Sequence, residues 1–189
     1  LPVAPGDDRY TTFLSDHSAE QALRDAVLER PVRRLLDIGT GTGRALELLG
    51  ADVDVGVGID ASREMLALAR AKLEHAGLQN CRVRHADLYE LPFSDQSFDA
   101  VMIHHVLRFV KDPARALREA ARVMADGARI VVIDLAGDGA TDPGFRDADL
   151  GAWFQAAGIQ PDTVIKFPVG NGREHIWRGV RPSEDRISE

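Results

Sequence analysis

The sequence predicts an α/β fold in three layers, in which a mostly parallel sheet lies between two layers of helices. Short apolar runs alternate five times with helical stretches, a pattern typical of parallel strands joined by crossover helices. Two further apolar runs, residues 164–169 and 174–180, flank Gly170, Asn171 and Gly172, which is a hairpin signal. We therefore expect five parallel strands and a closing antiparallel pair.

The first helix and the first strand lead into a glycine-rich turn. A helix is expected over about residues 19–30, because Ser18 and Gln21 have the spacing of a capping box. The apolar run VRRLLDI, residues 32–38, predicts the first strand. A helix over about residues 43–49 follows the glycines.

Capping signals delimit the later helices. Ser62 precedes a helix whose apolar stripe ends at Gly77. Asp112 and Pro113 are a favourable N-cap and first-turn pair for a helix that Gly127 ends. Pro168 cannot donate to a neighbouring strand, so its strand should lie at the sheet edge or end there. The other predicted strands are residues 53–59, 81–85, 98–103 and 128–135, and the other predicted helices are residues 63–76, 113–124 and 147–157.

Length and composition indicate one domain. The chain has 189 residues, of which 44% are apolar, 28% charged and 6% aromatic, and a domain of this size needs no disulfide or metal to fold. Cys81 is the only cysteine, which excludes a disulfide framework and fits a reducing compartment, so we expect a cytoplasmic protein. We predict an N-terminal segment over residues 1–18, one domain over 19–182 and a tail over 183–189.

The acidic net charge disfavours anionic partners. The chain carries 30 acidic and 23 basic residues, a net charge of −7, and such a surface is repelled by phosphate backbones and anionic lipid. No apolar run approaches the ~18 residues of a membrane span. We therefore expect a small-molecule partner rather than nucleic acid or a membrane, and leave a homodimer open. The chain begins at Leu1 without an initiator Met, which favours a further segment upstream.

The strongest functional signal is the turn LLDIGTGTG, residues 35–43. Glycines let a ligand approach the backbone closely, and ligands of open α/β sheets bind beyond the carboxyl ends of the strands. The spacing is not the GxGxxG of dinucleotide sites, because Arg44 or Leu46 stands where the last glycine would be. Asp37, before the glycines, would repel a pyrophosphate and attract an ammonium group. The turn therefore favours a ligand with a charged amino group and no phosphate.

Carboxylates accompany three consecutive strands. Asp37 precedes the turn, Asp60 ends the second strand and Asp87 follows the third. Asp60 can accept both hydroxyls of a ribose, and Asp87 beside the Leu88 N–H matches the donor and acceptor of adenine. Taken alone, Asp60 fits equally well as an acid near a helix start, and Asp87 as an ordinary loop acid. Their convergence on one sheet edge favours the binding interpretation for all three.

These motifs resemble the class I S-adenosylmethionine-dependent methyltransferases, particularly the bacterial small-molecule group similar to the ubiquinone/menaquinone methyltransferases. The resemblance covers residues 19–135, with LLDIGTGTG at 35–43, VGIDASREMLALAR at 57–70, ADLYELPF at 86–93, SFDAVMIHHVLRFVKDP at 97–113 and EAARVMADGARIVVIDL at 119–135. It implies a Rossmann-like sheet of seven strands and methyl transfer from S-adenosylmethionine to a small molecule by in-line displacement. The pattern also resembles the methyltransferase half of fusion proteins with an N-terminal winged-helix regulator.

The resemblance further implies which residues bind the cofactor. The methionine part is expected to bind Asp37 and the backbone of the glycine turn, and the ribose is expected to bind Asp60. The adenine is expected to lie along the segments that follow the predicted strands 53–59 and 81–85. The complete predicted set is Asp37, Gly39, Thr40, Gly41, Gly43, Asp60, Ala61, Met65, Asp87, Leu88 and His104, in which Ala61 and Met65 line the adenine, Asp87 and Leu88 contact its edge, and His104 lies beside the sulfonium.

His104 is also the candidate catalytic base. A neutral imidazole near pH 7 could take a proton from a hydroxyl or amine acceptor; alternatively His104 only lines the pocket and His105 packs under the next helix. The two side chains would point apart if the strand continued. No third ligand stands at helical spacing, so no metal site is predicted.

Two alternative functions remain. A non-catalytic domain that binds S-adenosylmethionine as a signal for a regulator would need the same turn, because methyl transfer requires no signature base. A nicotinamide oxidoreductase is less favoured, since GxGxxG and Tyr-x-x-x-Lys are both absent. The acceptor and its accepting atom stay open. Residues 1–18, as a lid, and the short glycine-rich segment 136–146 are expected to shape the acceptor pocket, and the second segment is expected to be mobile above an open pocket.

Overall fold

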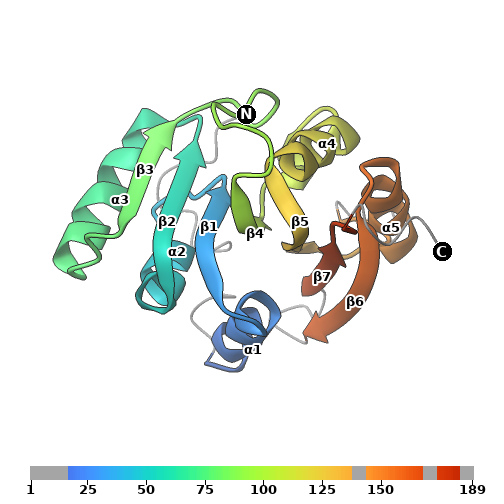
Figure 1. Ribbon diagram of the computed structural model, residues 1–189, viewed down its shortest axis with the longest axis horizontal. Coiled ribbons are helices and arrows are strands. Elements are labelled where there is room, and N and C mark those ends of the chain that lie inside the picture. Colours follow the sequence, from blue (N-terminus) through green and yellow to red (C-terminus); the bar gives the residue numbers. More distant parts are fainter. Residues whose placement is uncertain (1–16, 138–143, 168–173, 184–189) are drawn as a thin grey trace.

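The computed structural model describes residues 17–137, 144–167 and 174–183. One sheet runs through it, with helices on both faces (Figure 1). Its strands are β1 (Val32–Ile38), β2 (Val53–Asp60), β3 (Cys81–His85), β4 (Phe98–His104), β5 (Met124–Leu135), β6 (Gln160–Phe167) and β7 (Glu174–Val180). The helices are α1 (His17–Leu28), α2 (Arg44–Leu49), α3 (Arg63–His75), α4 (Pro113–Val123) and α5 (Asp147–Ala156), with short 3₁₀ turns η3 (Gly50–Asp52) and η4 (Leu107–Phe109).

The strand order is β3-β2-β1-β4-β5-β7-β6. Strands β1 to β5 are parallel, and β7 lies antiparallel between β5 and β6. This arrangement confirms the predicted seven-stranded, mostly parallel sheet with a C-terminal antiparallel hairpin. The order of strands reverses between β1 and β4, and the carboxyl edge at such a switch point is where open α/β sheets bind ligands.

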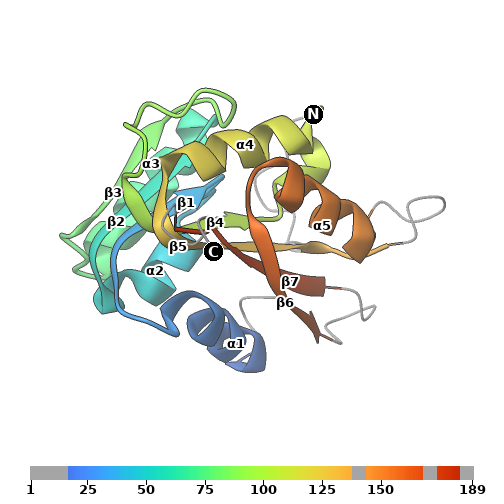
Figure 2. The same cartoon turned by 45° about the vertical axis from the view of Figure 1, so that its right-hand side comes forward.

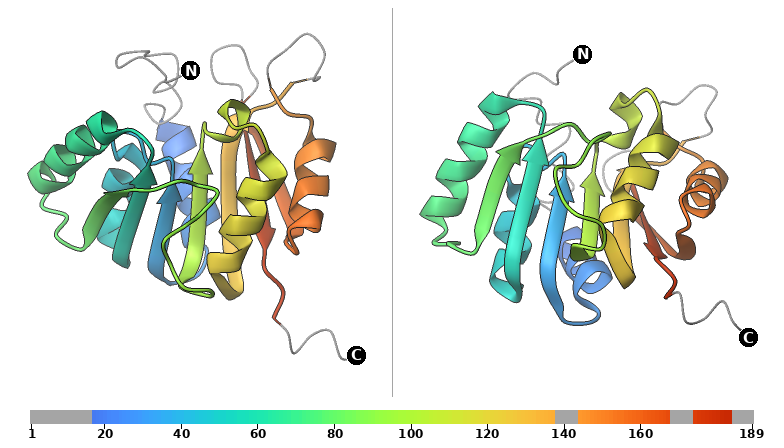
Figure 3. Two further views of the ribbon diagram at one scale, coloured as in Figure 1. Left: turned by 90° about the horizontal axis from the view of Figure 1, so that it is seen from above. Right: turned by 45° about the horizontal axis from the view of Figure 1, so that its top comes forward.

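Two apolar cores lie on the two faces of the sheet. Alternate residues of the central strands enter opposite cores: Ile130 and Val132 of β5 belong to one, Val131 and Ile133 to the other. The first core packs against α4 and α5 and the second against α1 and α2, so the helices form the two outer layers (Figure 3). The central strands are mostly apolar along their buried residues because both of their faces are covered.

The predicted helix caps at Ser62 and Asp112 are confirmed. The Ser62 hydroxyl accepts the Met65 N–H at 3.2 Å and starts α3, and the Asp112 carboxylate accepts the Arg115 N–H at 2.9 Å and starts α4. Each side chain satisfies one of the backbone donors that a helix start leaves unpaired. The capped α3 follows β2 directly, so its first turn lies beside Asp60.

The capping box predicted at Ser18 is wrong. Helix α1 begins at His17, so Ser18 lies inside its first turn. The Gln21 amide donates to Asp25 at 2.8 Å, one turn ahead, instead of turning back toward the helix start.

The last hairpin also departs from the prediction in one detail. Strand β6 begins at Gln160, four residues before the predicted start, and Pro161 lies at a shift of register within it. A missing N–H is tolerated there because β6 is the edge strand. The described part of the strand reaches Phe167, and Pro168 with the rest of the predicted run lies outside the described residues. Helix α4 ends at Val123, and β5 begins before the glycine that was expected to end the helix.

The Asp147 carboxylate at the start of α5 fastens the helix to the hairpin. It accepts the Trp177 indole N–H at 2.9 Å, lies 2.7 Å from His175 Nδ1 and pairs with Lys166 at 3.1 Å. Figure 2 shows the hairpin between α1 and α5. This contact fixes the first residues of β7 at the carboxyl end of β5. No helix in the described ranges is both long and apolar enough to cross a membrane.

Candidate functional site

The glycine-rich turn lies at the carboxyl end of β1, at the switch point of the sheet. Its three glycines have φ of 75°, 53° and 76°. The Gly39 and Thr40 N–H groups donate to the Ile59 carbonyl at 2.8 and 2.9 Å, which fastens the turn to β2. A Cβ on Gly39 would lie 2.1 Å from Val106, whereas a Cβ on Gly41 would meet nothing within 4 Å. The first glycine is therefore needed for packing, and the middle one leaves its space open.

The Asp60 carboxylate is oriented by backbone donors at the end of β2. Its Oδ2 accepts the Gly41 N–H at 2.9 Å and its Oδ1 accepts the Ser62 N–H at 2.8 Å. The second contact is the helix-start role that the sequence left as an alternative, and the first joins Asp60 to the glycine turn. Each carboxylate oxygen has a second lone pair, so the group can accept further hydrogen bonds.

Asp37 is a buried carboxylate directly beneath the turn. Its side chain is 1% exposed, and neither oxygen has a hydrogen-bond partner among the described residues. Burial raises its pKa from 3.8 to about 7; Thr40 opposes the rise and Asp60 adds to it. Buried carboxylates are normally paired, because desolvation without a partner is costly. A ligand that supplies a cation at this point would remove that cost.

The adenine residues of the prediction lie farther along the same sheet edge. Asp87 is exposed and accepts the Tyr89 N–H at 2.8 Å, and Leu88 is half-buried. Met65 is half-buried in the first turn of α3, and Ala61 is exposed. The structure therefore brings Asp37 and Asp60 together at the turn. The residues predicted to bind adenine lie farther from the switch point, at the ends of β2 and β3.

The two adjacent histidines end β4 side by side. Strand β4 stops at His104, and His105 takes a positive φ of 53°. The expectation of opposed side chains assumed a continuing strand; here the ring centroids are 4.3 Å apart. Burial, His105 and Arg108 hold the pKa of His104 well below its ordinary value. His104 is therefore neutral at pH 7 and a weak proton acceptor.

Sequence reasoning missed a buried charged cluster beyond these histidines, formed by His105, Arg108, Asp134 and Glu174. Arg108 Nη1 lies 3.4 Å from Asp134 Oδ1, and His105 Nε2 lies 3.2 Å from Glu174 Oε1. Burial raises the pKa of Asp134 to about 6 and that of Glu174 to about 7, while Arg108 lowers both. The available signal was Asp134, an acid inside the apolar run of β5.

The two segments expected to shape the acceptor pocket lie largely outside the described residues, which exclude 1–16 and 138–143. The described ends of the second segment are joined. Phe145 N–H donates to the Leu135 carbonyl at 2.9 Å, and Gly137 N–H donates to the Phe145 carbonyl at 3.0 Å. Gly144 packs against Ala136 where a Cβ would lie 2.4 Å from its carbonyl carbon. The expected mobility of this connection and the lid over residues 1–18 stay predictions.

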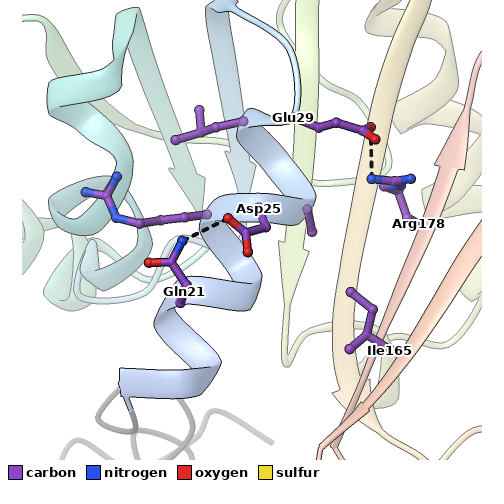
Figure 4. A pocket seen from close by; sticks show the side chains of 8 residues that line it. Gln21, Asp25, Glu29, Ile165 and Arg178 are labelled. Carbon is purple, nitrogen blue, oxygen red and sulfur yellow. Dashed lines mark hydrogen bonds and ion pairs between the residues drawn. The ribbon is translucent and has the colours of Figure 1, made fainter.

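A groove between α1 and β6 lies apart from this edge (Figure 4). Its charged groups already have partners: the Gln21 amide donates to Asp25, and Arg178 pairs with Glu29 at 3.0 Å. A groove whose charges are mutually satisfied presents no chemistry comparable to Asp37. We therefore place the candidate site at the glycine turn.

Comparison with known proteins identifies the family of this chain. Residues 36–132, from β1 to β5, match the methyltransferase domain. The chain belongs to this methyltransferase family. It is 33% identical over 203 residues to a ubiquinone/menaquinone biosynthesis C-methyltransferase of Geotalea daltonii, covering 94% of this chain and 83% of that protein. It is 40% identical over 140 residues to a demethylmenaquinone methyltransferase of Thermus thermophilus, covering 70% and 62%. S-adenosylmethionine is the cofactor of such a methyltransferase, as the motifs predicted.

Other relatives match this chain over only part of their length, and solved structures share its fold at low sequence identity. The chain spans about half the length of other curated relatives, among them a phosphatidylethanolamine N-methyltransferase of Cereibacter sphaeroides, 41% identical over 102 residues. The YcgJ protein of Bacillus subtilis has the same fold, with a TM-score of 0.77 and 20% identity over 89% of this chain and 100% of that one. The [4+2]-cyclase SpnF also has this fold, with a TM-score of 0.78 and 19% identity, over 88% of this chain and 80% of the cyclase.

We expect Asp37→Asn to stabilise the cofactor-free protein by about 1–3 kcal/mol at pH 8, because it removes an unpaired buried charge. The unfolded carboxyl ionises near 3.8 and the folded one near 7, so the wild-type free energy of unfolding falls as pH rises between these values. The difference in free energy of unfolding between Asp37→Asn and wild type should grow from about pH 4 to about pH 7 and then stay constant. Urea unfolding at several pH values measures it, with exposed Asp54→Asn as control. A variant less stable than wild type at pH 8 contradicts the interpretation.

Gly41→Val should abolish binding of S-adenosylmethionine, since a branched side chain would fill the open space and resist a positive φ. Gly158→Val is the matched control, because Gly158 also has a positive φ, of 73°, and open space around its Cβ position, but ends α5 away from the turn. Both variants should lose similar stability, and only Gly41→Val should lose binding in calorimetry. Equal affinity in the two variants would show that no ligand approaches this turn.

Proposed function

We propose that the chain transfers a methyl group from S-adenosylmethionine to a small-molecule acceptor by in-line displacement. The observation that carries this proposal is Asp37, a buried carboxylate without a protein partner beneath a turn whose middle glycine leaves its space open. An ammonium group of a ligand at that turn would neutralise Asp37. The family match supports methyl transfer as the chemistry.

The residues at the sheet edge fit the parts of the cofactor in order. Asp37 would hold the methionine ammonium, and the carboxylate oxygens of Asp60 would accept the ribose hydroxyls while they keep their bonds to Gly41 and Ser62. The remaining contacts fall to the predicted adenine residues, which are Ala61, Met65, Asp87 and Leu88. When bound, S-adenosylmethionine supplies a methyl group already activated by its sulfonium.

The chain's own contribution is mainly to position and desolvate the reactants. Holding an acceptor in line with a bound donor supplies much of the acceleration of such a displacement. His104, half-buried at the end of β4 and neutral because its pKa is held low, would line the site beside the reacting carbon. Its depressed pKa disfavours the catalytic role predicted for it, which stays a prediction.

A small-molecule acceptor is supported by the relatives, although their names differ in the accepting atom. The C-methyltransferase and the demethylmenaquinone methyltransferase are named for quinone acceptors, whereas the phosphatidylethanolamine enzyme is named for a nitrogen. Asp37, which suits an ammonium, would repel a pyrophosphate and so disfavours nicotinamide chemistry. A sensor that binds S-adenosylmethionine without transferring its methyl group would need the same Asp37. The test must therefore separate binding from turnover.

Calorimetry with S-adenosylmethionine and with NAD, run side by side, tests the proposal. We expect binding of S-adenosylmethionine alone, and Asp60→Ala should weaken it by about 1–3 kcal/mol, because two hydroxyls lose a charged acceptor. Asp54→Ala, on the exposed opposite end of β2, should leave it unchanged. Binding of NAD instead, or full affinity in a folded Asp60→Ala variant, would refute the assignment. Transfer of a labelled methyl group to any member of an acceptor panel separates an enzyme from a sensor.

His104→Ala tests the residual base hypothesis. If His104 only lines the pocket, cofactor affinity and turnover should fall together and modestly. If it removes a proton, turnover should fall by roughly 10²–10⁴-fold while affinity stays constant. Because burial keeps its pKa low, we expect the first result. Parallel measurement of kcat and of the calorimetric Kd distinguishes the two.

A further inference from the structure

We propose that Glu174 accepts the proton of an acceptor hydroxyl during methyl transfer, and that the acceptor is therefore a small molecule with an acidic hydroxyl group. This inference rests on the proposed function, since it concerns the acceptor side of the same site. It adds a catalytic residue from β7, which lies outside residues 36–132 of the family match.

Glu174 is assigned to the acceptor because it lies on the opposite side of the glycine turn from the residues proposed for the cofactor. The acids for its methionine, ribose and adenine parts stand at β1, β2 and β3, which run outward from the switch point. The ends of β4, β5 and β7, on the other side, are left for the acceptor. Glu174 pairs with Leu135 at the carboxyl end of β5 and contacts His105, the residue after β4. It therefore stands on the acceptor side of the turn.

The Glu174 side chain is placed to receive a proton. The residue is only 6% exposed, and its Oε1 lies 3.2 Å from His105 Nε2. Its Oε2 is buried and has no hydrogen-bond partner among the described residues. A buried carboxylate oxygen with an unused lone pair is uncommon and needs an explanation. A ligand hydroxyl that donates to Oε2 would supply one.

The charges around Glu174 favour uptake of a proton. The neighbouring groups are His105 directly after β4, Arg108 in η4 and Asp134 on β5, and His104 at the end of β4 lies beside His105. The partner of Glu174 on β6 is the apolar Phe167. Among the described residues, Arg108 lies 3.4 Å from Asp134 and His105 lies 3.2 Å from Glu174, so two buried carboxylates share this cluster with one guanidinium and one imidazole. Burial accordingly raises the pKa of Glu174 to about 7, against the effect of Arg108.

The backbone beside Glu174 is held in an uncommon conformation. His105 has a φ of 53°, although it is not glycine, and its N–H donates to the Ile133 carbonyl at 2.8 Å. Left-handed backbone at a bulky residue is costly and collects at functional sites. Here it turns the His105 ring away from the strand direction and toward β7. The strain thus serves the contact that orients Glu174.

A hydroxyl suits this cluster better than an amine. As the hydroxyl proton moves to Glu174 Oε2, the electron pair of its O–H bond forms the new bond from oxygen to the methyl carbon. The bond between that carbon and sulfur breaks, and its pair stays on sulfur. Oxygen gathers negative charge on the way, which the nearby Arg108 stabilises.

Glu174→Gln, assayed in the full chain with a reduced naphthoquinone as the hydroxyl probe and an alkylamine as comparison, tests the proposal. Glu74→Gln, exposed near the end of α3, is the control. Wild-type kcat should fall about tenfold per pH unit below the Glu174 pKa, because the protonated carboxyl cannot accept. The kcat of Glu174→Gln should be roughly 10²–10⁴-fold lower than that of wild type and should no longer depend on pH in this way. Glu174→Asp should recover part of the lost kcat. Calorimetric affinity for S-adenosylmethionine should be the same in all variants.

Infrared difference spectra give a second measurement that needs no turnover. A protonated-carboxyl band that titrates near neutral pH in wild type and is missing in Glu174→Gln supports the assignment. Since Asp37 and Asp134 also have raised pKa values, only the difference between the two proteins is diagnostic. Identical carboxyl bands in wild type and Glu174→Gln at every pH, a Gln variant within tenfold of wild-type kcat, or methylation of the amine alone would overturn it. Failure of the wild type to bind S-adenosylmethionine would instead overturn the proposed function itself, and the hydroxyl assignment with it.

Discussion

The cost of burying the Asp37 carboxylate is the constraint around which this structure is organised. A charge in that position is expensive unless a partner is present, and the described residues supply none. The carboxylate is held there because β1 is central, hydrogen-bonded to β2 on one side and β4 on the other, and covered by a helix layer on each face. Two apolar cores therefore stabilise a local arrangement that is unfavourable until a cation arrives.

Much of the fold could be predicted because its signals are local. The strands at 32–38, 81–85 and 174–180 begin and end where the apolar pattern places them, and Ser62 and Asp112 cap helices through bonds to residues three positions ahead. The errors arose where local rules compete. Ser18 satisfies a capping pattern but lies inside α1, and an edge strand tolerates Pro161, which an interior strand would not.

The residues that we propose for the cofactor could be named from the sequence, whereas those that we propose for the acceptor could not. Asp37 and Asp60 lie at the carboxyl ends of β1 and β2, and Asp87 follows β3. Topology alone therefore brings these three acids to one edge of the sheet. Arg108, Asp134 and Glu174 come from η4, β5 and β7, and no spacing joins them. They meet only because β7 inserts antiparallel beside β5, which places the first residue of β7 opposite the last residue of β5.

This division explains how one fold accommodates different chemistry. The [4+2]-cyclase SpnF shares the architecture at 19% identity, so the fold does not by itself fix a reaction. What distinguishes one member from another must lie where the fold leaves sequence free, which is the edge formed by β4, β5 and β7. In this chain that edge holds two carboxylates, one guanidinium and two adjacent histidines in contact, one of them with a strained backbone. Buried charge of this kind contributes little to stability, so its presence beside the donor site is best explained by the acceptor that it handles.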